Sequence, residues 1–479
     1  MNKLDLSKWF QDSSDVVQIT KSFDGKQGTY NLTFLYCPNL VDSNAINETI
    51  LPKIINEKAK EEIILSEHLC GLLGVTQLSN VGNIKNEIEK KVFSGELIIF
   101  DEDFRSVYSI PVSNAPKRTP EESNLETSVR GPRDGFVENI SDNMALIRQR
   151  LKTTSLKSKE YTIGERSKTK IVLLYMEDIL NPTLLNEVQQ RLESINMDVL
   201  NSSYQLEEML YDYKFSIFPL MDYIGRPDFV VESLNQGRFA ILVDGSPSCL
   251  IGPTNMVQLL LSPEDVNNSF FYISFVRLLR LVALMTTIFL PGFFIGLITF
   301  QTEQVPYNLL ATISMTRVGL PLSGAMEAII MITLFELFKE AGLRLPKAVG
   351  QTVAVLGGLI IGDAAIRAGL TSPAMLVVIS ITVISGYTLI NQNIAGNVLL
   401  LRYFVLIFSS ILGLYGFFLA YFLIIIFVFA LESFGQPYVS FLTTPNVSNI
   451  LRTLMKFPIS LLKKRNPAYH PKNNTRQRE

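Results

Sequence analysis

The apolar C-terminal half of the sequence contains several ionisable residues, among them Glu327, Glu336, Asp363 and Arg367. A charged side chain is costly in lipid unless it faces protein or water. Glu327 and Glu336 are nine residues apart, which places them on roughly opposite sides of a helix rather than in one paired site. Asp363 and Arg367 are four residues apart, the spacing of an ion pair on one helical face. We expect these residues to lie near a polar path through the apolar half, with hydrogen bonding between helices or a tight subunit seam as the alternative.

A second charged group lies in the stretch SVRGPRDGFVENISDNMALIRQRLK, residues 128–152. Its members are Arg130, Arg133, Asp134 and Glu138. Glycines and a proline predict a turn, and residues 138–151 then have the spacing of a short helix with one apolar face. The arginines could bind a carboxylate or phosphate in bidentate fashion, or pair with nearby acids and hold two lobes in register. The second role is the more common one for such residues.

Few residues are suited to catalysis or metal binding. The sequence has no phosphate-binding P-loop, no dinucleotide fingerprint and no HExxH motif. Its two histidines, His68 and His470, leave little for a mechanism that pairs a nucleophile with histidine. Cys37, Cys70 and Cys249 are scattered without metal-ligand spacing. We therefore expect a protein that is not an enzyme and that binds no cofactor and no metal.

Composition divides the chain into two unlike halves. Its 479 residues are 47% hydrophobic and 18% charged, with a net charge of −2, which offers no basic field for nucleic acid. Up to about Val266 the sequence is mixed and polar, whereas residues 281–431 are dominated by long apolar runs. The start, MNKLDLSKWFQDSSD, lacks the apolar core of a signal peptide. We expect a cytoplasmic soluble half joined to a membrane half.

The soluble half is predicted to be duplicated. A β-rich run at residues 30–37 is followed by apolar positions with helical spacing, and residues 170–176 are followed by the same pattern. Later in each copy come two β-rich runs around a turn, at residues 93–111 and 236–253. These pairs recur in the same order, which predicts two α/β subdomains of similar topology. A chance match between common strand-helix-hairpin arrangements is the alternative.

The apolar half contains several candidate spans. Residues 281–300 and 403–431 are uncharged and long enough to cross a bilayer, the second with tilt. Residues 319–338 form a further span, followed by a basic loop at 339–347. Two shorter runs, 349–362 and 373–387, surround Asp363 and Arg367, an interruption typical of either a re-entrant element or an external turn. The count is therefore four spans with a re-entrant element, or five spans.

The C-terminal tail favours the first count. From residue 451 onward it carries eight Lys and Arg residues against one Glu, so it belongs on the cytoplasmic side, where residues 451–462 could lie along the anionic leaflet. The predicted fold class is an α+β/α multidomain chain, a two-lobed α/β domain with duplicated strand-helix-hairpin subdomains followed by an α-helical transmembrane domain. The predicted division is 1–125, first α/β subdomain; 126–155, charged inter-lobe linker helix; 156–268, second α/β subdomain; 269–435, transmembrane helical domain; and 436–479, basic cytoplasmic tail.

Four long motifs stand in order along the chain: VRGPRDGFVENISDNMALIRQRLK, IGRPDFVVESLNQGRFAILVDGSP, LPGFFIGLITFQTEQVPYNLL and ELFKEAGLRLPKAVGQTVAVLGGLIIGDAAIRAGLTSPAMLVVI. With these motifs the sequence resembles the A subunit of the GerA-family spore germination receptors, over roughly residues 126–431. The first strand-helix region and the basic tail are less distinctive.

The resemblance implies a role in dormant endospores of Bacillus and Clostridium relatives, in the inner spore membrane. Members of this family sense nutrient germinants together with a transporter-like B subunit and a lipoprotein C subunit. The resemblance further implies that A subunits form a homo-oligomeric ion channel whose opening releases cations. The resemblance also makes a coupling or subunit-interface role as well supported as simple packing of the lobes for four residues: Arg130, Arg133, Asp134 and Glu138.

Two other function classes are weighed against the channel. A secondary transporter would show broken apolar runs in two matching halves, and here they occur once. A membrane-anchored signalling scaffold would use its spans only as an anchor. The charges of Glu327 and Glu336 within the apolar half argue against a passive anchor.

Overall fold

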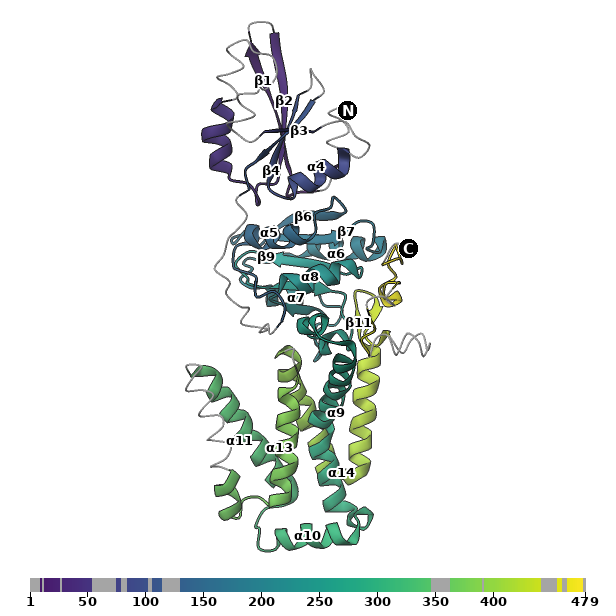
Figure 1. Ribbon diagram of the computed structural model, residues 1–479. Coiled ribbons are helices and arrows are strands. Elements are labelled where there is room, and N and C mark those ends of the chain that lie inside the picture. Colours follow the sequence, from purple (N-terminus) through teal and green to yellow (C-terminus); the bar gives the residue numbers. More distant parts are fainter. Residues whose placement is uncertain are drawn as a thin grey trace.

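The computed structural model comprises two α/β subdomains followed by a region of long helices (Figure 1). It describes residues 9–10, 13–25, 28–53, 75–78, 84–101, 106–113, 130–345, 362–389, 392–440, 455–458 and 463–476. The predicted apolar run at 349–362 lies almost wholly outside these residues, as do Cys70 and most of 451–462.

The first subdomain contains a five-stranded antiparallel sheet with the strand order β1-β2-β4-β5-β3. Its strands are β1 Val17–Gly25, β2 Gly28–Tyr36, β3 Thr76–Leu78, β4 Glu96–Asp101 and β5 Ser106–Pro111. The π-helix η1 Ala45–Ile50 packs on one face of the sheet and α4 Ile84–Val92 on the other. Because side chains alternate between the faces, Ile98 of β4 joins the α4 cluster while Ile99 joins the η1 cluster. A strand covered on both faces reads as a continuous apolar run.

The second subdomain repeats this sheet with the order β6-β7-β9-β10-β8. Its strands are β6 Leu156–Ile163, β7 Thr169–Met176, β8 Asp222–Ile224, β9 Phe239–Val243 and β10 Cys249–Gly252. Its helices are α5 Ile140–Arg150, α6 Pro182–Ser194, α7 Ser203–Leu210 and α8 Pro227–Asn235. When the five strands of each copy are numbered along the chain, both sheets have the same spatial order: first, second, fourth, fifth, third. The predicted duplication is therefore confirmed, with a first strand and a short edge strand that the sequence pattern did not indicate.

Helix α6 forms where the sequence predicts it. The side chain of Asn181 accepts a hydrogen bond from the backbone N–H of Thr183, and a proline occupies the first turn, which suits a helix start because that N–H is not needed. Leu184, Val188 and Leu192 are buried on one face. In the first copy the matching helical residues include buried Ile46, Ile50 and Leu51, while the part of that predicted helix from residue 54 onward lies outside the described residues.

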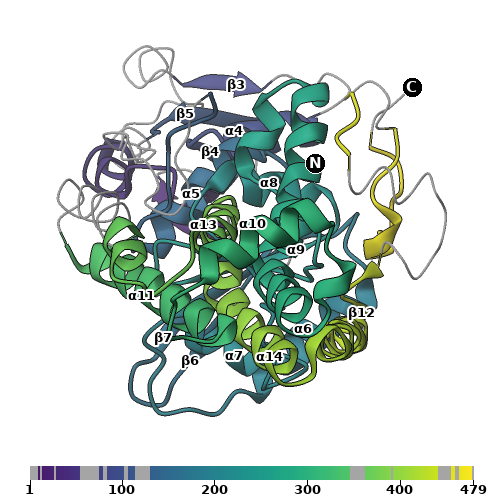
Figure 2. The same ribbon diagram turned by 90° about the horizontal axis from the view of Figure 1, so that it is seen from below.

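The C-terminal region consists of long helices that run beside one another (Figures 1 and 2). They are α9 Phe270–Phe300, α10 Tyr307–Arg317, α11 Gly324–Arg344, α13 Pro373–Tyr387 and α14 Gln392–Ala430. Helix α10 lies across the end of the others (Figure 1). Short elements complete the described part, namely η2 Gln258–Leu260, η3 Pro263–Asn267, η4 Thr302–Gln304, β11 Glu432–Ser433, β12 Gln436–Pro437 and η6 Pro467–Tyr469. Among described residues, two stretches are long and apolar enough to cross a membrane, Phe270–Phe300 and Gly396–Ala430.

Helix α14 folds back on itself at Gly413. This residue has φ 63° and ψ −144°, which interrupts the helical backbone and suits glycine because it lacks a Cβ. Ser409, four residues before Gly413, lies beside Gly292 of α9. Phe417, four residues after it, packs against Phe293 with ring centroids 5.4 Å apart. Residues on either side of the break therefore meet the same level of α9, and α14 is a hairpin of two antiparallel arms.

Two predicted boundaries are corrected by these helices. The prediction of a single tilted span over residues 403–431 is wrong. The chain reverses at Gly413, so residues 403–412 belong to the first arm of α14. The loop predicted at 339–347 is wrong up to residue 344, because α11 continues to Arg344, where an i,i+4 ion pair with Glu340 (2.8 Å) supports its last turn. Helix α11 also begins five residues later than predicted, since Gly319 has φ +89° and Ser323 caps the helix.

Part of the C-terminal tail packs against the second subdomain. The backbone N–H of Lys472 donates to Ile179 O at 2.8 Å, and Arg465 Nε donates to Asn235 O at 2.7 Å. The tail therefore returns to the same end of the helical region from which α9 departs (Figure 1).

Candidate functional site

Glu327 lies in the first turn of α11, and its side chain is fully buried. One carboxylate oxygen accepts the backbone N–H of Ser372, the N-cap of α13, at 2.9 Å. The other lies 3.4 Å from a guanidinium nitrogen of Arg317, the last residue of α10. One carboxylate therefore joins three helices, and its charge is compensated by both partners.

Glu336 lies farther along α11 and is partly exposed. Arg402 of α14 places a guanidinium nitrogen 3.6 Å from its carboxylate, and Lys339 lies 3.3 Å away on the same helix. The buried Arg402 also donates from Nε to the backbone oxygen of Thr287 in α9, at 3.0 Å. Because Glu336 keeps 23% of its side chain exposed while Arg402 keeps 4%, the carboxylate is the accessible member of this pair.

Buried hydroxyl groups continue the polar contacts beside Arg402. Thr287 Oγ1 donates to Ala283 O of its own helix at 2.7 Å and lies 3.5 Å from Thr382 O of α13. Such back-bonding satisfies a hydroxyl inside an apolar helix. We call Glu336, Arg402, Thr287 and Thr382 the polar seam. It lies between α9, α11, α13 and α14.

The four residues predicted from the apolar half do not form one cluster. Glu327 and Glu336 are separated by about 14 Å along α11 and have different partners. Asp363 and Arg367 form the predicted i,i+4 ion pair at 2.8 Å, with 61% and 79% of their side chains exposed. The sequence analysis missed both arginine partners, Arg317 and Arg402. Each is a single charge within an otherwise apolar or neutral stretch, and that signal could have identified them.

The four predicted inter-lobe residues do not share one partner; two of them contact different side chains, Glu264 and Arg150. The backbone N–H of Arg130 donates to Glu264 at 3.3 Å, and Asp134 forms an ion pair with Arg150 of α5 at 2.5 Å. Arg133 and Glu138 are exposed, and the backbone oxygen of Glu138 accepts the N–H of Gly245. The predicted helix is present as α5, with Ile140, Met144 and Ile147 buried on one face.

A buried ion pair that the site prediction omitted links the two subdomains. Arg148 of α5 binds both carboxylate oxygens of Asp15, with Nη2 at 2.9 Å from Oδ1, and both side chains are buried. Arg148 also donates to the backbone oxygens of Thr153 and Leu156, and Ser158 donates to Asp15 at 2.7 Å. The charged groups of both side chains thus have hydrogen-bond partners, as a buried ion pair requires.

A hydrogen bond and several ion pairs at η3 connect the inter-lobe segment with α9. Glu264 accepts Arg226 at 2.7 Å as well as the Arg130 N–H. The next residue, Asp265, is buried and pairs with Arg277 and Arg280 of α9, both at 3.1 Å. The two carboxylates are adjacent in η3, so the inter-lobe segment and the first long helix contact the same short element.

The comparison with known proteins decides the family. Residues 5–468 match the family described as Bacillus/Clostridium GerA spore germination protein. The chain belongs to the GerA family. Spore germination protein XA of Bacillus anthracis is 41% identical over 480 residues, covering 100% of this chain and 97% of that protein. Spore germination protein B1 of Bacillus subtilis (strain 168) is 35% identical over 479 residues, covering 100% and 98%.

The resemblance predicted from the motifs is thereby confirmed, and it extends beyond residues 126–431. Among solved structures, this GerA-family chain is similar to the crystal structure of the N-terminal domain of the A subunit of the Bacillus megaterium spore germinant receptor GerK3. That similarity covers 52% of this chain and 92% of that chain, with 26% sequence identity and a TM-score of 0.40.

Some titratable side chains outside the polar seam are also buried, among them Cys37 and Glu207. Within the described residues, no group of three or more His, Cys, Asp or Glu side chains could hold a metal ion. Burial raises the pKa of the Cys37 thiol to about 12, so this cysteine is an unreactive core residue. Burial also raises the pKa of Glu207 to about 7, although the hydroxyl of Tyr211 donates to its carboxylate at 2.5 Å.

Proposed function

We propose that this GerA-family chain is the A subunit of a nutrient germinant receptor that triggers spore germination. In this proposal several copies assemble into an ion channel that couples germinant sensing to cation release, together with a transporter-like B subunit and a lipoprotein C subunit. The observation that carries the receptor role is the family match over residues 5–468. The chain would act without enzymatic activity and without a cofactor.

Exposed apolar side chains support a membrane location for the helical region. Large apolar residues line the outer surfaces of α9 and of both arms of α14, and many are more than half exposed. Examples are Phe271, Phe275, Val282, Ile411, Tyr415, Phe422, Ile426 and Phe429. A soluble monomer rarely exposes a continuous apolar surface of this kind. Lipid of the spore inner membrane and neighbouring subunits would cover it, with the N-terminal subdomains and the tail on the cytoplasmic side.

The polar seam supports the channel. An accessible carboxylate within an apolar helical region is costly unless it meets water, protein or an ion, and Glu336 is the accessible carboxylate of the seam. We assign it the role of cation contact in the path. Glu327 would hold α10, α11 and α13 in place, and the exposed Asp363 and Arg367 would face water or a neighbouring subunit.

The inter-lobe segment would transmit the signal. Arg130, Arg133, Asp134 and Glu138 lie in the segment that contacts Glu264, whose neighbour Asp265 holds α9. A change in this segment could therefore reach the first long helix through η3. Charge reversal of Arg133 and Asp134 should impair either receptor assembly or the nutrient response, and intact assembly with an intact response would contradict this role.

A flux assay distinguishes the channel from the alternatives. The full chain, purified with its B and C subunits, is reconstituted into liposomes and K⁺ release is recorded with and without germinant. A channel gives rapid release that does not saturate at low ion concentration. A secondary transporter gives slow, saturable exchange, and a membrane-anchored scaffold gives release no faster than protein-free liposomes; either result would refute the channel.

A further inference from the structure

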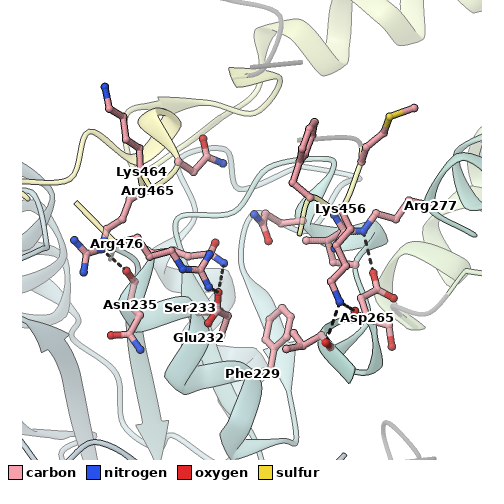
Figure 3. A pocket seen from close by; sticks show the side chains of 18 of the residues that line it. Phe229, Glu232, Ser233, Asn235, Asp265, Arg277, Lys456, Lys464, Arg465 and Arg476 are labelled. Atoms are coloured by element: carbon pink, nitrogen blue, oxygen red, sulfur yellow. Dashed lines mark hydrogen bonds and ion pairs between the residues drawn. The ribbon is translucent and has the colours of Figure 1, made fainter. Parts of the chain in front are cut away.

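A cavity of about 210 Å³ lies between α8, η3, the start of α9 and the C-terminal tail. In Figure 3, Arg465 and Arg476 of the tail lie on one side of it, and Lys456 and Arg277 lie on the other. Lys464 stands at its rim, and its side chain is exposed. The cavity is thus bounded by basic residues from parts of the chain that are far apart in sequence.

The charges around this cavity are unbalanced. Its lining includes five basic side chains but only two carboxylates, Glu232 and Asp265. Both carboxylates are already paired, Glu232 with Arg476 at 2.6 Å and Asp265 with Arg277 at 3.1 Å. The lining therefore has an excess of positive charge.

The remaining basic groups contact neutral atoms. Lys456 Nζ donates to the backbone oxygens of Asp265, Val266 and Asn268, at 2.6, 2.9 and 2.8 Å. Arg465 likewise donates to backbone oxygens, including Asn235 O at 2.7 Å. Within the part of the chain that the structure describes, the Lys464 ammonium has no hydrogen-bond or ion-pair partner. These contacts hold the side chains in place without neutralising them.

The pKa shifts of Lys456 and Arg465 are consistent with this excess of positive charge. Burial, followed by the charge of Arg277, lowers the pKa of Lys456. Burial also lowers the pKa of Arg465; the charge of Asp178 opposes this shift, and the charge of Arg476 adds to it. Like charges on the lining thus oppose one another, and an anion placed between them would remove that repulsion.

We propose that this cavity binds a phosphate group. The guanidinium groups offer the planar pairs of N–H donors that match phosphate oxygens, and the lysines add point charges. The volume is smaller than the roughly 300–1,000 Å³ of pockets that hold whole small molecules, which suits a single phosphate or the phosphate of a lipid headgroup. Binding would tie the tail to the start of α9 and to α8.

The phosphate could come from solution or from an anionic phospholipid. Arg277 precedes the apolar residues that begin at Leu281 by four positions, or about 6 Å along the helix. If the helical region crosses the membrane as proposed above, the cavity lies at the level of the headgroups. Only the lipid source rests on that proposal, because phosphate binding itself depends on the cavity alone.

Thermal unfolding of the full chain in a neutral detergent tests the site at constant ionic strength. The probes are inorganic phosphate, short-chain phosphatidylglycerol and, as a zwitterionic comparison, short-chain phosphatidylcholine. The site variant is K464Q/R476Q. The matched control is K463Q/K472Q, which removes two charges from the same tail at residues that do not line the cavity.

The wild-type chain and the control should show the same rise of Tm with phosphate or phosphatidylglycerol. The site variant should need about tenfold more ligand for half of that rise, since one charge-assisted hydrogen bond is worth about that factor. A response to phosphate identifies the free anion as a ligand, and a response to phosphatidylglycerol alone identifies the lipid. No rise in the wild type, or equal losses in the two double variants, would overturn the proposal, and neither result bears on the receptor role.

Discussion

The carboxylate of Glu327 accepts the backbone N–H of Ser372 at 2.9 Å, so a side chain of α11 caps α13. The hydroxyl of Ser372 accepts the N–H of Met375 in addition, and α13 thereby begins with two of its free donors satisfied. Glu327 is fully buried whereas Glu336 is 23% exposed, so the two glutamates of α11 lie in different environments. In the proposed channel, Glu327 would stabilise the packing of the helices and Glu336 would contact the ion.

Substitution of Glu327 should affect stability before it affects conduction. In E327A the buried N–H of Ser372 loses its acceptor and Arg317 loses its counter-charge, which should cost about 3 kcal/mol of unfolding free energy. E327Q retains an acceptor for Ser372 and should lose less. Thermal unfolding of the detergent-solubilised chain compares the two variants, and equal losses would show that the cap contributes nothing.

Substitution of Glu336 should affect conduction. E336Q removes the charge that an ion would meet, so we expect germinant-triggered K⁺ release from the reconstituted liposomes to fall at least severalfold. The matched control is E340Q on the same helix, where the exposed Glu340 pairs only with Arg344 among the described residues. Unchanged flux in E336Q, at the same protein content as wild type, would remove this carboxylate from the path.

Loss of Arg148 should destabilise the junction of the two subdomains. R148M leaves the buried Asp15 without its bidentate partner, at an expected cost of about 3–5 kcal/mol. R150M is the control, because Arg150 forms a partly exposed ion pair with Asp134 that is worth at most about 1 kcal/mol. Trp9 is the single tryptophan of the chain and packs against the first subdomain's core, so its fluorescence during urea unfolding reports this region. Equal midpoints in the two variants would contradict the assignment.

The buried Glu207 should make stability depend on pH. Burial raises its pKa from the usual 4.5 to about 7 in the folded chain, so the folded state holds the proton more tightly than the unfolded state. Stability from this group is complete below pH 4.5 and is lost as the pH rises through 7. The change amounts to about 3 kcal/mol at most. E207Q should remove this component of the Tm decrease between pH 5 and pH 8, and an unaltered decrease would show that Glu207 titrates normally.

Glycine should be required at the reversal of α14. A Cβ at Gly413 would lie 2.7 Å from Phe300 Cβ, and its φ of +63° is unfavourable for other residues. We expect G413A to lose about 1–3 kcal/mol. G396A is the control, since no atom lies within 4 Å of its added Cβ and alanine favours the helix. Tm values of the two variants should therefore move in opposite directions.

Local patterns predicted the α/β subdomains well. The run KIVLLYM became β7 because its residues alternate between two covered faces, with Leu174 in the α5 and α8 core and Leu173 in the α6 and α7 core. The recurrence of these patterns in the same order predicted two subdomains of similar topology, which the matching strand orders confirm. Strand β6, LKSKEYTI, was missed because three of its eight residues, Lys157, Lys159 and Glu160, are charged, which weakens the β-rich signal.

Contacts between distant residues could not be predicted in this way. Asp15 and Arg148 are 133 positions apart, and no local spacing relates them. The chain reversal at Gly413 could not be predicted either. Both arms of α14 are uniformly apolar, and hydropathy gives no information on the direction of the chain. Arg317 and Arg402 became meaningful only when the packing of α11 placed a glutamate beside each of them.

The docked tail closes a long loop of the chain. Arg476 pairs with Glu232 across 244 positions, and α9, α10, α11, α13 and α14 all lie between these two residues in sequence. The entropic cost of closing a loop rises only slowly with its length, so a few tail contacts can hold so long a loop closed. The start of α9 and the end of α14 are therefore kept together at this end of the helical region by the tail and the second subdomain.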